Sequence, residues 1–275
     1  MIAQAHLGGI LLDIGLELMI GLLAFGGGMV AGLLGISGAI IMIPLMLYVL
    51  PLLGYSQLDV RTVAAIAIVQ GFAASSSAIF VYLRRNQVNG SIALLGGAFV
   101  ASGALVGGIL SKWTPELLIL ILFGIFTLSV TFLMALPGDK DDHIDLDTFK
   151  FNKRWRLSIF VPEGLLAGTI GVGGGVMTVP ILHRILSVPL RIAVGSSLGM
   201  TWFAVTAGLV GKAMTGQVPI DLSLAVVLGA VPGAQVGAFL HQYVATKHIR
   251  IIFVLLLGVT TLRTWLDVLD RAHFF

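Results

Sequence analysis

Apolar residues fill almost the whole chain, in long blocks separated by short polar or glycine-rich stretches. A helix that crosses a membrane needs about 20 consecutive, mostly apolar residues. The block at 11–54 is roughly twice that length, so we expect it to break within its glycine-rich stretch at 32–38. The pattern predicts helical segments at about 11–34, 38–53, 60–83, 91–110, 115–136, 157–171, 174–188, 191–212, 220–241 and 247–268.

One hydrophilic stretch, at 137–156, divides the chain in half because it concentrates Asp, Lys and Arg residues. We interpret it as a polar cytoplasmic linker between a first membrane repeat at 1–136 and a second at 157–275. No Lys or Arg occurs in residues 1–9, whereas a cleaved secretory signal begins with a basic region. The first apolar segment is therefore expected to be a retained membrane helix.

A glycine-containing segment occurs in both halves. Residues 31–44 read AGLLGISGAIIMIP, and residues 167–180, which lie 136 positions later, read AGTIGVGGGVMTVP. Further along, the offset falls to 130, and there Arg61 faces Arg191 and Gly103 faces Gly233. We infer a duplicated unit of about five helical segments. A glycine-broken apolar segment repeated in the two halves of a membrane protein indicates a transporter binding site.

The distribution of Lys and Arg favours an inverted relation between the halves, because cytoplasmic loops carry more of these residues. If each broken pair of segments returns to its starting side, the inverted arrangement places eleven Lys and Arg residues on the linker side and five outside. A parallel arrangement gives ten and six. The expected fold is therefore an all-α polytopic protein of the cell (inner) membrane. It has two inverted repeats, with the first pair of segments in each repeat broken or re-entrant and both termini outside.

The composition excludes several classes of protein. Hydrophobic residues make up 57% of the chain and charged residues 11%, whereas a soluble domain carries about 25% charged residues. The absence of Cys excludes disulfides and thiolate metal sites. A net charge of +3 reports loop topology here and not nucleic-acid affinity. No Ser/His/Asp set and no metal-ligand spacing converges in the sequence, so we expect neither an enzyme nor a cofactor.

The chemistry expected at a broken helix is anion binding. Unpaired backbone groups are tolerated within a membrane only inside protein or against a water-filled cavity, and a helix that restarts there presents free N–H groups and the positive end of its dipole. The candidates are Gly38, Gly173, Gly174 and Gly175 for main-chain N–H groups, and Ser37 and Thr178 for hydroxyl groups. Helix packing through small residues is the alternative explanation of a single glycine cluster, and the duplication favours the site.

Other polar residues are weaker candidates. Ser196 and Ser197 can donate to an anion or bond within their own helix. Gln70 can bind an anion or bridge two helices, and Arg61 and Arg191 can attract an anion to a cavity mouth or extend to the lipid headgroups. We expect no charged side chain in the middle of the unbroken spans. The main-chain N–H groups are therefore the leading candidates for anion binding.

The broken segments resemble the sulfite exporter TauE/SafE family, also called TSUP. The resemblance rests on the glycines of 168–175 with Pro180, on Gly32, Gly35, Gly38 and Pro44 in the first half, and on Arg191 followed by Gly195-Ser196-Ser197. The first half departs from the last element with Ala65-Ile66-Ala67. The resemblance implies a transporter of a sulfur-containing anion such as sulfite, sulfoacetate or another sulfonate.

The hypothesis from the sequence is a secondary transporter that moves this small oxyanion by alternating access, and an anion channel on the same scaffold is the alternative. The expected partners are the anion and membrane lipid, with no nucleic acid. Gly103-x-x-x-Gly107 and Gly233-x-x-x-Gly237 indicate close helix contact, either within the fold or in a homodimer. The sequence leaves the substrate, the direction of transport and the coupling ion open.

Overall fold

The computed structural model describes residues 2–34, 37–84, 88–135, 154–175, 177–240 and 246–272, and within these ranges the secondary structure is entirely helical. The first half contains α1 (Ile2–Leu34), α2 (Ala39–Pro44), η1 (Leu45–Val49), α3 (Leu50–Leu52), α4 (Val60–Arg84), α5 (Gly90–Leu110) and α6 (Glu116–Ala135). The second half contains η2 (Arg154–Ile159), α7 (Phe160–Ile170), α8 (Thr178–Pro180), η3 (Ile181–Ile185), α9 (Leu190–Met214), α10 (Ile220–Leu240) and α11 (Thr246–Ala272). Most of the hydrophilic stretch predicted as the linker lies outside the described residues.

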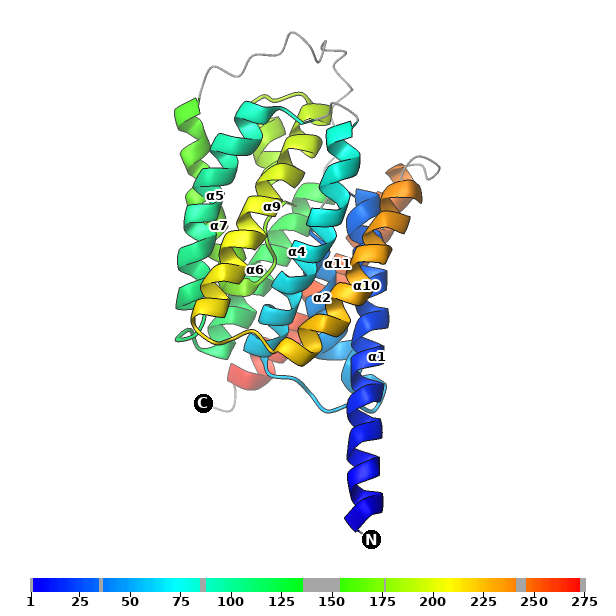
Figure 1. Cartoon of the computed structure of the whole chain (residues 1–275). Helices are drawn as coiled ribbons and strands as arrows, with labels where there is room; N and C mark the ends of the chain where they lie inside the picture. Colours follow the sequence, from blue (N-terminus) through cyan, green and yellow to red (C-terminus); the bar gives the residue numbers. More distant parts are fainter. Residues whose placement is uncertain are drawn as a thin grey trace.

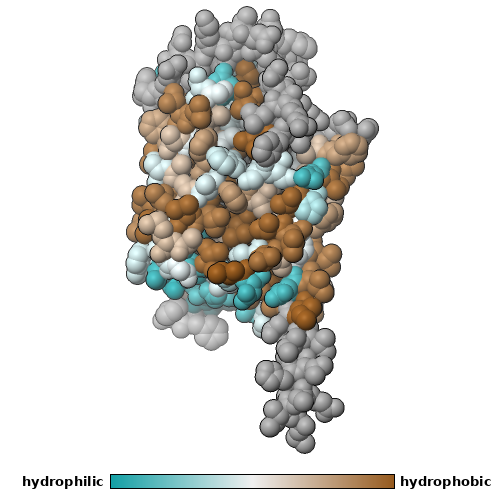
Figure 2. Space-filling model, in the orientation of Figure 1, coloured by the Kyte–Doolittle hydropathy of each residue, from teal (hydrophilic) through white to brown (hydrophobic). Residues whose placement is uncertain are grey.

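Six of the described helices are long and apolar enough to cross a membrane. Figure 2 shows a broad hydrophobic band across the middle of the molecule, with hydrophilic residues gathered along the lower border. Large apolar side chains such as Leu22 on α1 and Leu228 on α10 point out of the bundle. Because such side chains would be costly to expose to water, this band is the surface that faces lipid. The protein is a multi-pass membrane protein, as the sequence predicted.

Each half contains a helix that breaks and turns back. After α1 and the break, the chain returns along α2 to α3, and the Tyr55 hydroxyl just beyond α3 donates to the carbonyl of Gly15 in α1, 3.2 Å away. In the second half, Leu182 and Leu186 after the break pack in one core cluster with Phe160 at the start of α7. The expected broken pairs are therefore present, and both return toward their starting ends.

The restarting helices share an irregularity that proline explains. Pro44 and Pro180 each end a short α-helical turn and are followed by a π-helical turn, η1 and η3. Proline lacks the N–H of a normal i→i−4 bond, and its ring displaces the carbonyl four residues earlier. The next bonds therefore shift by one residue, as in the bond from Leu186 N–H to the Ile181 carbonyl.

Glycines allow the broken helices to lie directly against helices of the other half. A Cβ at Gly32 of α1 would collide with the Ala234 carbonyl of α10, and a Cβ at Gly168 of α7 would collide with the Ala104 carbonyl of α5. Gly32 and Gly168 are 136 positions apart, and Ala104 and Ala234 are 130 positions apart. In each contact, therefore, a broken helix of one half supplies the glycine, and a helix of the other half supplies the carbonyl at the matching position.

The same exchange holds when α5 and α10 contribute the glycine. Gly237 of α10 faces the Met29 carbonyl of α1, and Gly107 of α5 faces the Leu165 carbonyl of α7. The glycine pairs that predicted close helix contact are thus used inside one chain. Figure 1 shows the start of α1 and the end of α11 at one end of the bundle, with the end of α6 and η2 at the other.

Candidate functional site

The two helix breaks meet at Ser37, whose side chain is completely buried. A Cβ built on Gly71 of α4 would lie 2.8 Å from Ser37 Oγ, one on Gly173 would lie 3.2 Å from the same atom, and one on Gly175 would lie 3.5 Å from Ser37 N. Segments about 135 positions apart in the sequence are therefore in contact. We call this region the central site, formed by Ser37, Gly38, Gly71, Gly173, Gly174, Gly175, Thr178 and Thr201.

The second break has a backbone that glycine favours. Helix α7 ends at Gly171, which has φ of +87° and donates its N–H to the Ala167 carbonyl. The following Gly173, Gly174 and Gly175 have φ of +78°, +72° and +86°, where a Cβ costs about 1–2 kcal/mol. Gly38 in the first break has an ordinary φ of −66°. The two breaks therefore match in position but differ in conformation.

Several buried main-chain N–H groups at the central site lack a partner. Among the described residues, no hydrogen bond is made by the main-chain N–H of Ser37, Gly38, Gly173 or Gly174, although all four residues are buried. The N–H of Gly175 donates to Thr178 Oγ1 at 3.1 Å. Since more than 90% of buried backbone groups in proteins are paired, a cluster of unpaired donors indicates a place where a ligand with acceptor atoms can bind.

Unsatisfied side-chain atoms border the same region. Thr201 Oγ1 on α9 is buried without a hydrogen-bond partner, and it lies 2.5 Å from a Cβ built on Gly175. Gln70, next to Gly71, donates its Nε2 to the Ala24 carbonyl at 3.3 Å while its Oε1 has no partner. Gln70 therefore joins α4 to α1 and keeps one polar atom unused.

Glu163 borders the central site, although the hydropathy pattern alone does not single it out. It lies near the start of the segment predicted at 157–171, but the structure buries it, with 5% of its surface exposed. Its Oε1 accepts a 2.6 Å hydrogen bond from Thr178 Oγ1, its Oε2 has no partner, and a Cβ built on Gly174 would lie 3.5 Å from Oε1. A comparison of the two halves is the signal that points to Glu163, because the equivalent position 136 residues earlier is Gly27 and the acidic residue is therefore specific to the second half.

The predicted serines of α9 have other partners. Ser196 and Ser197 are fully buried, and Ser196 Oγ accepts a 3.0 Å hydrogen bond from the main-chain N–H of Asn89. Asn89 in turn caps the first turn of α5, since its Oδ1 accepts from Ile92 N–H. Ser197 Oγ donates to the Val194 carbonyl of its own helix. Thr201, one turn after Ser197, is the α9 hydroxyl that remains unused at the central site.

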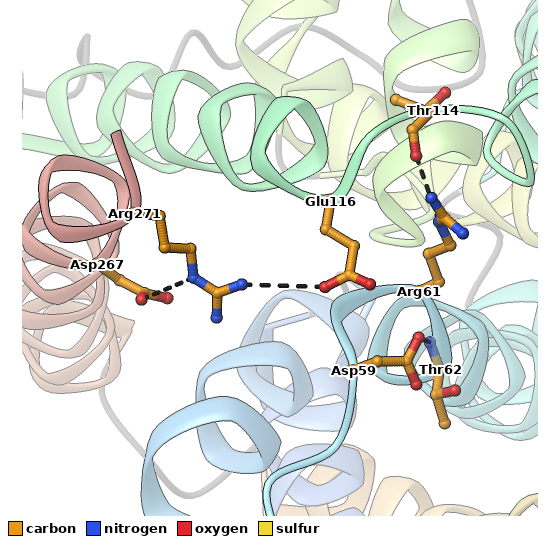
Figure 3. A network of polar contacts seen from close by, with 7 residues as sticks. All are labelled: Asp59, Arg61, Thr62, Thr114, Glu116, Asp267 and Arg271. Atoms are coloured by element: carbon orange, nitrogen blue, oxygen red, sulfur yellow. Dashed lines mark hydrogen bonds and ion pairs between the residues drawn. The ribbon is translucent and has the colours of Figure 1, made fainter. Parts of the chain in front are cut away.

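Arg61 lies at the end of the bundle and not at the meeting point of the breaks. Figure 3 shows it beside Thr114, whose carbonyl accepts a 3.3 Å hydrogen bond from Arg61 Nε. In the same view, Arg271 of α11 bonds to Asp267 at 3.0 Å and approaches Glu116 of α6 at 3.9 Å. These contacts join the ends of α4, α6 and α11. The side chain of Arg191, the equivalent of Arg61, lies outside the described residues.

A second buried polar cluster lies beyond the break of α7. Lys212 at the end of α9 is fully buried, and its Nζ donates to Ser111 Oγ at 2.8 Å and to the Thr169 carbonyl at 3.5 Å. The Thr169 carbonyl belongs to the last turn of α7, where the helix dipole is negative. The ammonium group therefore caps the end of the broken helix, and no carboxylate pairs with it among the described residues.

The comparison with known proteins agrees with this architecture. The family described as sulfite exporter TauE/SafE matches residues 20–264. The chain belongs to the sulfite exporter TauE/SafE family. It is 25% identical over 260 residues to the probable membrane transporter protein YunE of Bacillus subtilis, covering 86% of this chain and 93% of that protein.

Two further relatives of this TauE/SafE chain have the same kind of description. A probable membrane transporter protein of Methanocaldococcus jannaschii is 24% identical, covering 84% of this chain and 89% of the relative. One of Xylella fastidiosa is 26% identical, with 86% and 91% covered. No solved structure matches the chain significantly. The TauE/SafE chain is thus a membrane transporter and not an enzyme.

Proposed function

We propose that the protein is a secondary transporter that binds a small sulfur-containing anion, such as sulfite, sulfoacetate or another sulfonate, at the central site. The unpaired, buried N–H groups of Ser37, Gly38, Gly173 and Gly174 carry this proposal. A sulfonate group presents three oxygen acceptors, and main-chain donors of a broken helix can bind them without a charged side chain. The family description, sulfite exporter, supports a sulfur oxyanion as substrate.

Alternating access between two inverted repeats is the mechanism that we propose. The exchanged glycine contacts support it, because Gly32 with Ala234 and Gly168 with Ala104 are equivalent positions of the two halves. A pseudo-two-fold arrangement of this kind allows one conformation to open to each side of the membrane. The burial of Ser37 and Thr201 further implies that the site must open for the substrate to enter or leave.

Gly174→Ala tests the binding site with little change to packing. A Cβ at Gly174 meets only Glu163 Oε1 at 3.5 Å and Thr178 Oγ1 at 3.8 Å, so the methyl group fits. It would occupy space beside unpaired N–H groups, and blocking one hydrogen bond to a charged ligand costs about 1.5–3 kcal/mol. We expect methanesulfonate or sulfite to bind roughly 10- to 150-fold more weakly, measured by calorimetry on detergent-purified protein.

Gly216→Ala is the matched control. Gly216 also has a positive φ, +69°, but a Cβ there meets nothing within 4 Å, in the turn between α9 and α10. Both variants therefore carry the same backbone strain, about 1–2 kcal/mol, and only Gly174→Ala obstructs the central site. Equal affinities of Gly174→Ala and the wild type for both anions would contradict the assignment of the site.

Transport itself is tested in proteoliposomes loaded with unlabelled sulfite or methanesulfonate. A carrier accelerates the entry of the labelled anion by exchange and saturates with concentration, because each cycle requires a conformational change. We expect saturable counterflow from the wild-type protein, reduced in Gly174→Ala. Currents that increase linearly with concentration and show no counterflow would instead identify an anion channel on this scaffold.

A further inference from the structure

The carboxyl group of Glu163 has an unusual environment for an acidic residue. It is buried at 5% exposure, and Thr178 Oγ1 donates a 2.6 Å hydrogen bond to its Oε1. Oε2 has no hydrogen-bond partner in the part of the chain that the structure describes. A buried carboxylate is strongly disfavoured unless it is paired or well hydrogen-bonded. A carboxylic acid, which is neutral and can donate from Oε2, suits this environment better.

No cation compensates for Glu163 among the described residues, where it takes part in no ion pair. The ionisable groups on the elements packed around α7 and the second break are Arg61 on α4, Glu116 on α6, Lys212 on α9, Arg156 on η2, and His183 and Arg184 on η3. Lys212 bonds at Thr169, six residues along α7, or about 9 Å of helix rise. His183 contacts the Val188 carbonyl. The side chains of Arg84, Arg154 and Arg191 lie outside the described residues.

Glu163 is linked to the proposed anion donors through Thr178. The N–H of Gly175 donates to Thr178 Oγ1, which donates to Glu163 Oε1. The neighbouring Gly174, whose N–H is unpaired, lies against Oε1 as well. An anion bound at Gly174 would therefore place a second negative charge beside the carboxylate. Two like charges in a low-dielectric site raise each other's free energy, so the anion binds better when Glu163 is protonated.

We propose that Glu163 is a proton-binding site that couples anion transport to proton movement in the same direction. The inference rests on the proposed anion site and adds the coupling ion to it. On the side where loading occurs, a proton from solution binds the carboxylate and forms the acid, whose Oε2–H can donate to the anion. On the opposite side the anion leaves, and the O–H bond breaks to return the proton to water. For a singly charged sulfonate, one cycle therefore moves no net charge.

The second half alone carries this chemistry. The positions that correspond to Glu163 and Thr178 in the first half are Gly27 and Met42, which cannot bind a proton. A purely structural role for Glu163, in which it only holds the break through Thr178, would be retained by glutamine, because the amide oxygen still accepts from the hydroxyl. Glu163→Gln therefore separates proton coupling from structural support.

Binding of methanesulfonate as a function of pH is the first test. This anion keeps one negative charge in mildly acidic and neutral solution, so a pH effect comes from the protein. We expect the wild-type affinity to rise as the pH falls, by up to roughly tenfold per pH unit, and Glu163→Gln to bind with a pH-independent affinity. Glu116→Gln, which removes an acidic residue at the end of the bundle, is the control and should keep the wild-type profile.

Transport provides the second test. In proteoliposomes, an inwardly directed proton gradient should drive accumulation of methanesulfonate by the wild type. Glu163→Gln should lose this accumulation while it keeps counterflow exchange. Proton-driven accumulation by Glu163→Gln, or a wild-type pH profile in that variant, would overturn the proposal.

A direct measurement on the wild type covers the case in which Glu163→Gln does not fold. Methanesulfonate added to purified protein in weak buffer should be bound together with protons taken from the solution. Anion binding without proton uptake would overturn the coupling and leave the anion site intact. If neither methanesulfonate nor sulfite binds the wild type at any pH, the proposed function itself is overturned, and the coupling with it.

Discussion

Replacing Thr201 with valine should change stability and binding in opposite directions. Thr201 Oγ1 is buried at 1% exposure and has no hydrogen-bond partner. An unsatisfied buried polar group costs about 1–3 kcal/mol, so exchange of the hydroxyl for a methyl group should stabilise the empty protein by up to about that amount. If the hydroxyl instead donates to the bound anion, its loss should weaken binding by about 1.5–3 kcal/mol, or roughly 10- to 150-fold.

Both quantities can be measured on one detergent-purified sample. Thermal unfolding without ligand gives the stability change, and titration with methanesulfonate gives the affinity. Thr206→Val is the control on the same helix, because Thr206 Oγ1 already donates to the Trp202 carbonyl at 2.6 Å. We expect Thr206→Val to unfold at the wild-type temperature or slightly below and to bind normally. A Thr201→Val protein that is less stable and binds with unchanged affinity would refute this interpretation of the central site.

Three other substitutions test the packing and the capping of the broken helices. Gly107→Ala and Gly237→Ala should lower the unfolding temperature by similar amounts, because each Cβ would collide with an equivalent carbonyl of the other half. Gly258→Ala, where a Cβ meets nothing within 4 Å, should leave the unfolding temperature unchanged. A large difference between Gly107→Ala and Gly237→Ala would argue against equivalent contacts. Lys212→Met should leave the unfolding temperature unchanged or raise it, because burying an ammonium group among neutral partners costs desolvation free energy. Ser111 keeps its hydrogen bonds to Gly108 and Gln217 in this variant. A marked loss of stability would show that the cap on α7 outweighs the desolvation cost.

The helical segments could be predicted closely because their signals are local. The break expected at 32–38 falls between Leu34 and Ala39, and the second falls between Ile170 and Thr178. The first helix is longer than the predicted segment at about 11–34, since α1 begins at Ile2. The sequence predicts site candidates at these two breaks, and packing brings Gly71 and Thr201 beside them.

The roles of individual polar side chains were harder to predict. Arg61 and Ser196 were reasonable candidates by residue type, but their partners, the Thr114 carbonyl and the Asn89 N–H, lie 53 and 107 positions away. The hydropathy pattern gives no sign of the role of Glu163, because an acidic residue near the start of a hydrophobic segment is expected at the membrane surface. In a helix that turns back inside the protein, such a position faces the break instead of the lipid headgroups.

Hydropathy, glycine and proline act over a few residues, so the sequence alone predicts that the protein lies in a membrane and where its helices break. Which atoms meet at the central site depends on tertiary packing. Ser37 meets Gly173 and Gly175 because glycines let α1 and α7 each lie directly against a helix of the other half. That packing also leaves Glu163 Oε2 and Thr201 Oγ1 buried without a hydrogen-bond partner among the described residues. The free energy of such burial depends on contacts between residues far apart in the sequence.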